Sequence, residues 1–113
     1  PTYEQCCGRW HAGEPAPTAE ALMRSRYSAF VLHDEPYLLR TWHESTRPPT
    51  VDFDPHLRWT GLEVLESAER VVEFRASYVV AGAPGAVHEV SRFVRSVDGW
   101  QYVRGRLSGE TSP

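Results

Sequence analysis

The segment that decides the fold spans residues 71–106 and reads VVEFRASYVVAGAPGAVHEVSRFVRSVDGWQYVRGR. Apolar and polar residues alternate along its first part, and a period of two is the signature of a half-buried β-strand. Turn-forming residues interrupt the alternation twice. We therefore expect three antiparallel strands and two turns, with the strands at 72–80, 87–96 and 100–106 and the turns at 82–85 and 98–99.

A further strand is expected upstream, from residue 56. Leu57 and Trp59 share one parity, whereas Leu62 and Val64 follow the opposite parity. Gly61 lies where the parity changes, and a glycine at such a position predicts a β-bulge and a bent strand.

Two helices are expected before the strands. Residues 18–32 repeat apolar side chains at helical spacing, and Thr18 can cap this helix. Asp34 can cap a shorter helix over residues 35–43. Two helices followed by four hairpin-connected strands predict an α+β fold. We expect the helices to pack on a strongly curved antiparallel β-sheet that leaves a cone-shaped cavity.

Composition narrows the class of protein. A chain of 113 residues with 41% hydrophobic and 24% charged residues is typical of one soluble domain. The net charge of -3 gives no general attraction to nucleic acid. No apolar run reaches the roughly 18 residues that a membrane helix needs. With two cysteines and no apolar leader, a cytoplasmic location is the expectation.

Cys6 and Cys7 are adjacent and are the only cysteines in the sequence. Two neighbouring thiolates can bind zinc, but a closed tetrahedral site needs four donors. His11 could supply a third donor. Half of a zinc site is therefore one interpretation, and two free thiols are the other.

Arg26 is the most informative charged residue. On a helical wheel it falls at the centre of the apolar stripe, among Leu22, Met23 and Phe30. An unpaired buried guanidinium would cost several kcal/mol. We expect it to meet an acid, a set of carbonyls or a water-filled cavity. An ion pair with Glu73 or Glu89 is one possibility, and an anchor for a ligand carboxylate is the other.

Other side chains could line the same cavity. Trp42 and His43 close the second expected helix, and no orienting partner identifies His43 as a catalytic base. Trp100 and Tyr102 share the parity of Arg104, so Arg92 on the neighbouring strand could stack on either ring. We expect no catalytic residue. The predicted ligand pocket comprises Arg26, Tyr27, Tyr37, Trp42, His43, Trp59, Tyr78, Arg92, Trp100 and Tyr102.

Short runs along most of the chain resemble the YchJ family of bacterial proteins. These runs are YEQCC at 3–7, LMRSRYSAF at 22–30, YL at 37–38, TWH at 41–43, SRF at 91–93 and GWQY at 99–102. The resemblance implies a nuclear-transport-factor-two-like (NTF2-like) domain over 18–107. It also implies that 1–17 holds the second half of a SEC-C zinc knuckle plus a linker, with Cys6 and Cys7 as ligands. Residues 108–113 are polar, and we expect them to form a loose tail.

The resemblance brings no established reaction. We expect a bacterial accessory or adaptor protein whose zinc knuckle contacts a protein or ribosome-associated partner. Zinc is expected in the full-length protein, and an incomplete site in this chain. The alternative is a small-molecule-binding domain or enzyme with a polar-tipped cavity around Arg26. Nucleic-acid binding ranks last, because the chain is acidic overall.

Overall fold

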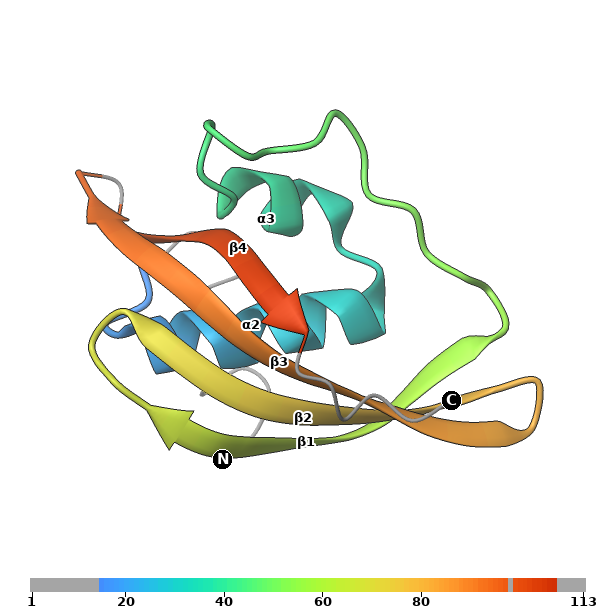
Figure 1. The fold of residues 1–113 in the computed structure, drawn as a ribbon. Helices are drawn as coiled ribbons and strands as arrows, with labels where there is room; N and C mark the ends of the chain where they lie inside the picture. The colour runs from blue at the N-terminus through green and yellow to red at the C-terminus, as the bar shows by residue number, and fades with distance from the viewer. Residues whose placement is uncertain (1–14, 98, 108–113) are drawn as a thin grey trace.

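A computed structural model describes residues 15–97 and 99–107. Within these residues two helices precede four strands, so the predicted α+β class is confirmed (Figure 1). The elements are α2 (Ala19–Leu32), α3 (Glu35–Arg40), β1 (Leu57–Ser67), β2 (Val71–Val80), β3 (Ala83–Ser96) and β4 (Gly99–Leu107). No helix among the described residues is long and apolar enough to cross a membrane.

Both predicted helix caps are confirmed. The Thr18 hydroxyl accepts the backbone N–H of Ala21 at 3.0 Å. The Asp34 carboxylate accepts the N–H of Tyr37 at 3.2 Å. Each cap satisfies a donor that the first helical turn leaves without an intrahelical partner.

Helix α3 ends at Arg40, three residues before the predicted end. The Thr41 hydroxyl donates to the carbonyl of Tyr37 at 2.8 Å and so closes the last turn. Beyond it the backbone pairs with β4, because Tyr102 N–H donates to Thr41 O and His43 N–H donates to Tyr102 O, both at 2.8 Å. A long-range pairing therefore replaces the last predicted helical turn.

The sheet is an antiparallel meander in the order β1-β2-β3-β4. The predicted turn at 82–85 is wrong, since Ala81 and Gly82 alone connect β2 to β3. Both have positive φ, 51° and 83°, as the favoured two-residue hairpin turns require. Pro84 then lies inside β3 at a point where β2 is the only paired strand among the described residues, so the missing N–H of proline is tolerated.

Bulges interrupt the register of the sheet. The register of β1 against β2 shifts between Trp59 and Gly61, which confirms the predicted bulge. On β4, Arg104 faces Arg92 whereas Tyr102 faces Phe93, so Val103 is an extra residue. This bulge in β4 reverses the parity of the strand beyond Tyr102.

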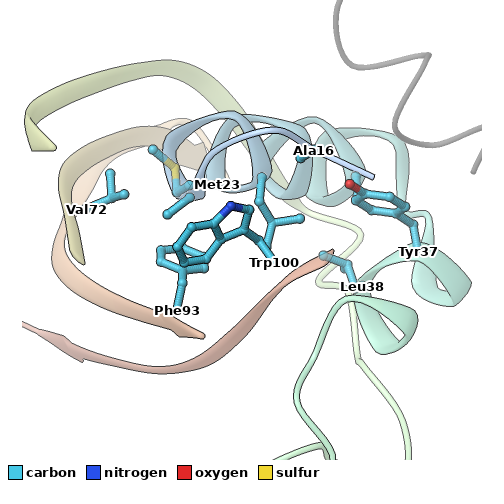
Figure 2. Packing of buried hydrophobic residues seen from close by; sticks show 10 residues of the cluster. Ala16, Met23, Tyr37, Leu38, Val72, Phe93 and Trp100 are labelled. Atoms are coloured by element: carbon cyan, nitrogen blue, oxygen red, sulfur yellow. The ribbon is translucent and has the colours of Figure 1, made fainter. Parts of the chain in front are cut away.

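The core lies between α2 and the face of the sheet that covers it (Figures 1 and 2). Phe93 and Trp100 from the sheet pack below α2, near Met23 (Figure 2). The indole N–H of Trp100 donates to the carbonyl of Pro17 at 3.3 Å, which ties the start of α2 to β4. Burying an aromatic ring of this kind contributes about 2–3 kcal/mol.

Candidate functional site

A cavity of about 170 Å³ lies between α2 and the sheet. Most of its walls are apolar or aromatic, and many of the side chains that line it are half-exposed, so the cavity opens to solvent. It is lined by Met23, Arg26, Tyr27, Phe30, Trp42, Trp59, Phe74, Ala76, Val87, Glu89, Ser91, Phe93 and Tyr102. Arg26 and Glu89 are the charged residues among them.

Arg26 points inward from α2 and is only 5% exposed. Its Nη1 atom donates to the carbonyl of Leu38 at 2.9 Å and to the hydroxyl of Thr41 at 2.8 Å. A backbone carbonyl was one of the partners expected from the sequence, and Arg26 bonds to one. It does not form the alternative ion pair with Glu73 or Glu89. Among the described residues, no acceptor bonds to Nε or Nη2, although the cavity lies beside the guanidinium.

Two aromatic rings hold the guanidinium group. Its central carbon lies 4.5 Å from the ring centre of Tyr102 and 5.0 Å from that of Trp42. The two rings meet edge to face at 5.1 Å. Desolvation by burial lowers the pKa of Arg26 to about 10, and the electrostatic influence of nearby groups opposes this shift. Arg26 is therefore charged at neutral pH, and ring faces take the place of a counter-ion.

Glu89 forms the acidic side of the cavity. Its Oε2 atom accepts the hydroxyl of Ser91 at 2.6 Å and that of Tyr102 at 3.5 Å. Burial raises the pKa of Tyr102 to about 12, and the neighbouring Glu89 carboxylate adds to the rise. The ring of Tyr102 thus contacts Arg26, while its hydroxyl contacts Glu89.

The structure brings together five of the ten predicted pocket residues. Lining the cavity are Arg26, Tyr27, Trp42, Trp59 and Tyr102. Trp42 also has an indole N–H that is buried without an acceptor among the described residues. A buried polar group of this kind is rare and marks the cavity wall as polar at that point.

The other five predicted residues lie elsewhere. Tyr37 is buried in the core, where its hydroxyl shares a hydrogen bond with Ser25 at 2.6 Å. Trp100 is likewise a core residue. Tyr78 packs edge to face on Trp59 at 5.7 Å, without lining the cavity itself.

Arg92 and His43 lie outside the predicted pocket. Arg92 is exposed and faces Arg104 across β3–β4, so the expected stacking on Trp100 or Tyr102 is wrong. The cause is the alternation of β3, because Phe93 faces Tyr102 on the inner side of the sheet and the next residue, Arg92, therefore points to the opposite side. The imidazole of His43 bonds to the hydroxyl of Ser45 at 2.8 Å and lies outside the cavity, since α3 ends before it.

The sequence did not single out Glu89 or Ser91 as cavity residues. Both occupy inward-facing positions of β3, opposite Phe74 and Val72. The sequence does place these two polar residues at positions of β3 where apolar residues are expected. This could have marked them as site residues, because a buried polar side chain needs a specific partner.

A larger depression of about 520 Å³ lies between the end of α2 and the start of β1. It is lined by Phe30, Val31 and His33, by residues from Pro55 to Trp59, and by residues around the β2–β3 turn. Its charged side chain, Arg58, is exposed. The smaller cavity is the better candidate site, because it combines a buried cation with aromatic walls.

Within residues 15–97 and 99–107, no group of three or more His, Cys, Asp or Glu side chains is placed to hold a metal ion. Cys6, Cys7 and His11 lie outside the described residues. The zinc site therefore stays a prediction.

Comparison with known proteins places the chain in a family. The family model for the middle NTF2-like domain of YchJ matches residues 18–105. A UPF0225 protein of Streptomyces coelicolor is 54% identical, covering 94% of this chain and 89% of its own. A UPF0225 protein of Polaromonas is 51% identical, covering 91% and 81%.

Solved structures agree with this assignment. A SEC-C motif containing protein from Rhodopseudomonas palustris superposes with a TM-score of 0.83 at 31% identity, covering 95% of this chain and 92% of its own. A SEC-C motif containing protein from Psychrobacter arcticus gives 0.78 at 30% identity, covering 99% and 76%. The four-stranded antiparallel sheet and two short helices are thus an NTF2-like domain, and the chain belongs to the YchJ (UPF0225) family.

Proposed function

We propose that the domain binds a small, largely apolar ligand whose polar end accepts hydrogen bonds from Arg26. The observation that carries the proposal is the state of the guanidinium group. It is buried and charged, and its Nε and Nη2 donors have no acceptor among the described residues. The buried donor that lacks a partner among the described residues is the indole N–H of Trp42, which lines the same cavity, and buried donors normally have a partner. An acceptor group on a ligand in the adjoining cavity would supply one.

The size of the cavity limits the ligand. A cavity of about 150 Å³ in another protein accommodates benzene. The 170 Å³ cavity between α2 and the sheet therefore suits a single ring, or a short branched chain, with one polar substituent. Its aromatic walls, which include Tyr27, Phe30 and Trp59, favour a flat apolar body.

The predicted cone shape belongs to this proposal. Bulges increase the local twist and bend of a strand. The register shifts at Gly61 and Val103 would wrap β1 and β4 toward α2 and widen the space around Arg26. Folds of this kind are used for many functions, so the fold alone does not select the ligand.

The experiment uses Met23, the single methionine of the sequence, as a reporter, because it lines the cavity. The intact protein is labelled with ¹³C-methyl methionine and titrated with toluene, benzoate, benzamide and benzylamine. The proposal expects a saturable shift of the Met23 methyl signal with at least one polar probe, and a weaker response to toluene.

Matched variants locate the binding. Ala76→Leu fills the cavity and is expected to abolish the shift, and Val87→Phe provides a second filling variant if the first does not fold. Ala86→Leu, at the neighbouring position of β3, faces away from the cavity and is expected to preserve the shift. Absence of saturation with every probe, or saturation unchanged in both filling variants, would refute the proposal.

A second candidate is the accessory or adaptor role, in which a zinc knuckle contacts a protein or ribosome-associated partner in the cytoplasm. Its support is that both solved relatives are described as SEC-C motif containing proteins, and that Cys6 and Cys7 resemble half of such a motif. Metal analysis of the intact protein tests it. One zinc per chain, lost in Cys6→Ser and Cys7→Ser, is the expected result; metal-free protein after growth in zinc would exclude the knuckle.

A further inference from the structure

The cavity holds two opposite charges that do not form an ion pair with each other. Arg26 and Glu89 both line it, yet the guanidinium donates to α3 and Thr41, while the carboxylate accepts from Ser91 and Tyr102. Tyr102 stands between the two groups, because its ring contacts the guanidinium and its hydroxyl contacts the carboxylate.

Each charged group keeps unused hydrogen-bonding capacity. Among the described residues, Nε and Nη2 of Arg26 lack an acceptor, and Oε1 of Glu89 lacks a donor. A charged carboxylate accepts at both oxygens, and a guanidinium donates through three nitrogens. The cavity therefore offers donors on one side and an acceptor on the other.

The positive charge of Arg26 and the negative charge of Glu89 give the cavity lining a formal net charge of zero. A simple anion would be attracted by Arg26 but repelled by Glu89. A simple cation would be attracted by Glu89 but repelled by Arg26. A neutral head group with an acceptor and a donor side by side can satisfy both, without bringing a net charge into an aromatic cavity.

We propose that Glu89 sets the chemical class of the ligand, which carries a carboxamide-like head, an acceptor facing Arg26 and a donor facing Glu89. This inference rests on the proposed function, since it specifies the ligand of the same cavity. It assigns Glu89 the role of a selectivity residue that excludes simple carboxylates.

The experiment compares matched probes on the intact protein. Benzamide, benzoate, benzylamine and toluene share a ring and differ in the head group. Dissociation constants come from the Met23 methyl titration at pH 7. Wild-type protein is expected to bind benzamide about tenfold more tightly than benzoate or benzylamine, which is the scale of one charge-assisted hydrogen bond.

Substitution at Glu89 tests the selectivity directly. Glu89→Gln keeps the shape and removes the charge, so benzoate is expected to gain about tenfold and the preference for benzamide to disappear. Glu63→Gln is the matched control, because Glu63 is an exposed carboxylate on the opposite face of the sheet, and it is expected to leave the ratio unchanged.

The two proposals fail in different ways. If benzoate binds the wild type as tightly as benzamide, or if Glu89→Gln leaves the ratio unchanged, the inference about Glu89 is wrong while ligand binding stands. If no probe saturates the Met23 signal, the proposed function fails and this inference fails with it.

Discussion

The carboxyl group of Glu89 fills the place that a side chain at Gly105 would take. A Cβ atom added to Gly105 would overlap Oε2 of Glu89. Gly105 faces Ser91 across β3–β4, and the hydroxyl of Ser91 donates to that same oxygen. The missing side chain on β4 therefore allows the carboxylate to lie across the strand pair, where Tyr102 reaches it.

Gly105→Ala is expected to displace this carboxylate. The methyl group forces Glu89 away and weakens its bonds to Ser91 and Tyr102, which should lower the free energy of unfolding by about 1 kcal/mol. Urea denaturation measures the loss. Gly61→Ala is the control, since a Cβ at Gly61 meets nothing within 4 Å, and it should stay within about 0.5 kcal/mol of the wild type. Equal losses in the two variants would show that Glu89 is not held by this gap.

Arg26→Lys is expected to destabilise the domain although the charge is kept. A lysine ammonium lacks the flat guanidinium that contacts Tyr102 and Trp42, and it cannot reproduce the paired donation of Nη1 to Leu38 and Thr41. The expected loss is about 2 kcal/mol, measured by urea denaturation.

Arg24→Lys is the control for this substitution, because it lies on the same helix. Arg24 is exposed and pairs with Glu20 one turn away. Exposed pairs of this kind contribute little, so the change should stay within about 0.5 kcal/mol. If both variants lost the same stability, the planar shape of Arg26 would not matter.

Local chemistry explains which parts of the fold were predictable. The caps at Thr18 and Asp34 and the bulge at Gly61 depend on residues close in sequence, and all three are confirmed. The end of α3 depends on a backbone pairing between Trp42 and Tyr102, which are 60 positions apart. No helical periodicity carries that information.

Some positions of the candidate site could also be predicted from the sequence, and others could not. The inward position of Arg26 follows from helical periodicity, and the structure bears it out. The stacking predicted for Arg92 fails because the register between β3 and β4 was unknown: Tyr102 faces Phe93, which places the adjacent Arg92 on the other side of the sheet. Trp100 satisfies the parity rule for the inner face but lies under the start of α2, where the core is filled. Parity selects a face of the sheet, and packing decides which part of that face stays open.

The phenol of Tyr102 is expected to make stability depend on pH in the alkaline range. Its pKa is raised from about 10 to about 12 in the folded protein, so the folded state keeps a proton that the unfolded state loses. The stabilising contribution is complete below pH 10 and declines as the pH rises toward 12. Tyr102→Phe lacks this group. The difference in unfolding free energy between wild type and variant should therefore shrink from pH 9 to pH 11.

Arg26 contributes with the opposite sign, because burial lowers its pKa from the usual arginine range to about 10. Stability from this group rises with pH above 10, but both proteins contain it, so it largely cancels in the difference. Urea midpoints at pH 9, 10 and 11 provide the measurement. A difference that stays constant over this range would mean that Tyr102 ionises like an exposed tyrosine.

Ala81→Gly is expected to stabilise the protein. Ala81 adopts a φ of 51° in the two-residue turn between β2 and β3, a left-handed conformation that costs a residue with a Cβ roughly 1–2 kcal/mol. Glycine removes this strain, although it adds backbone entropy to the unfolded chain, so a net gain of about 0.5–1 kcal/mol remains. Ala83→Gly, in the adjoining strand, adds the same backbone entropy to the unfolded chain without relieving any strain. Its free energy of unfolding should fall by about 0.5–1 kcal/mol. Urea denaturation of both variants checks the opposite signs; a loss at both positions would mean that the turn does not hold Ala81 in the left-handed region.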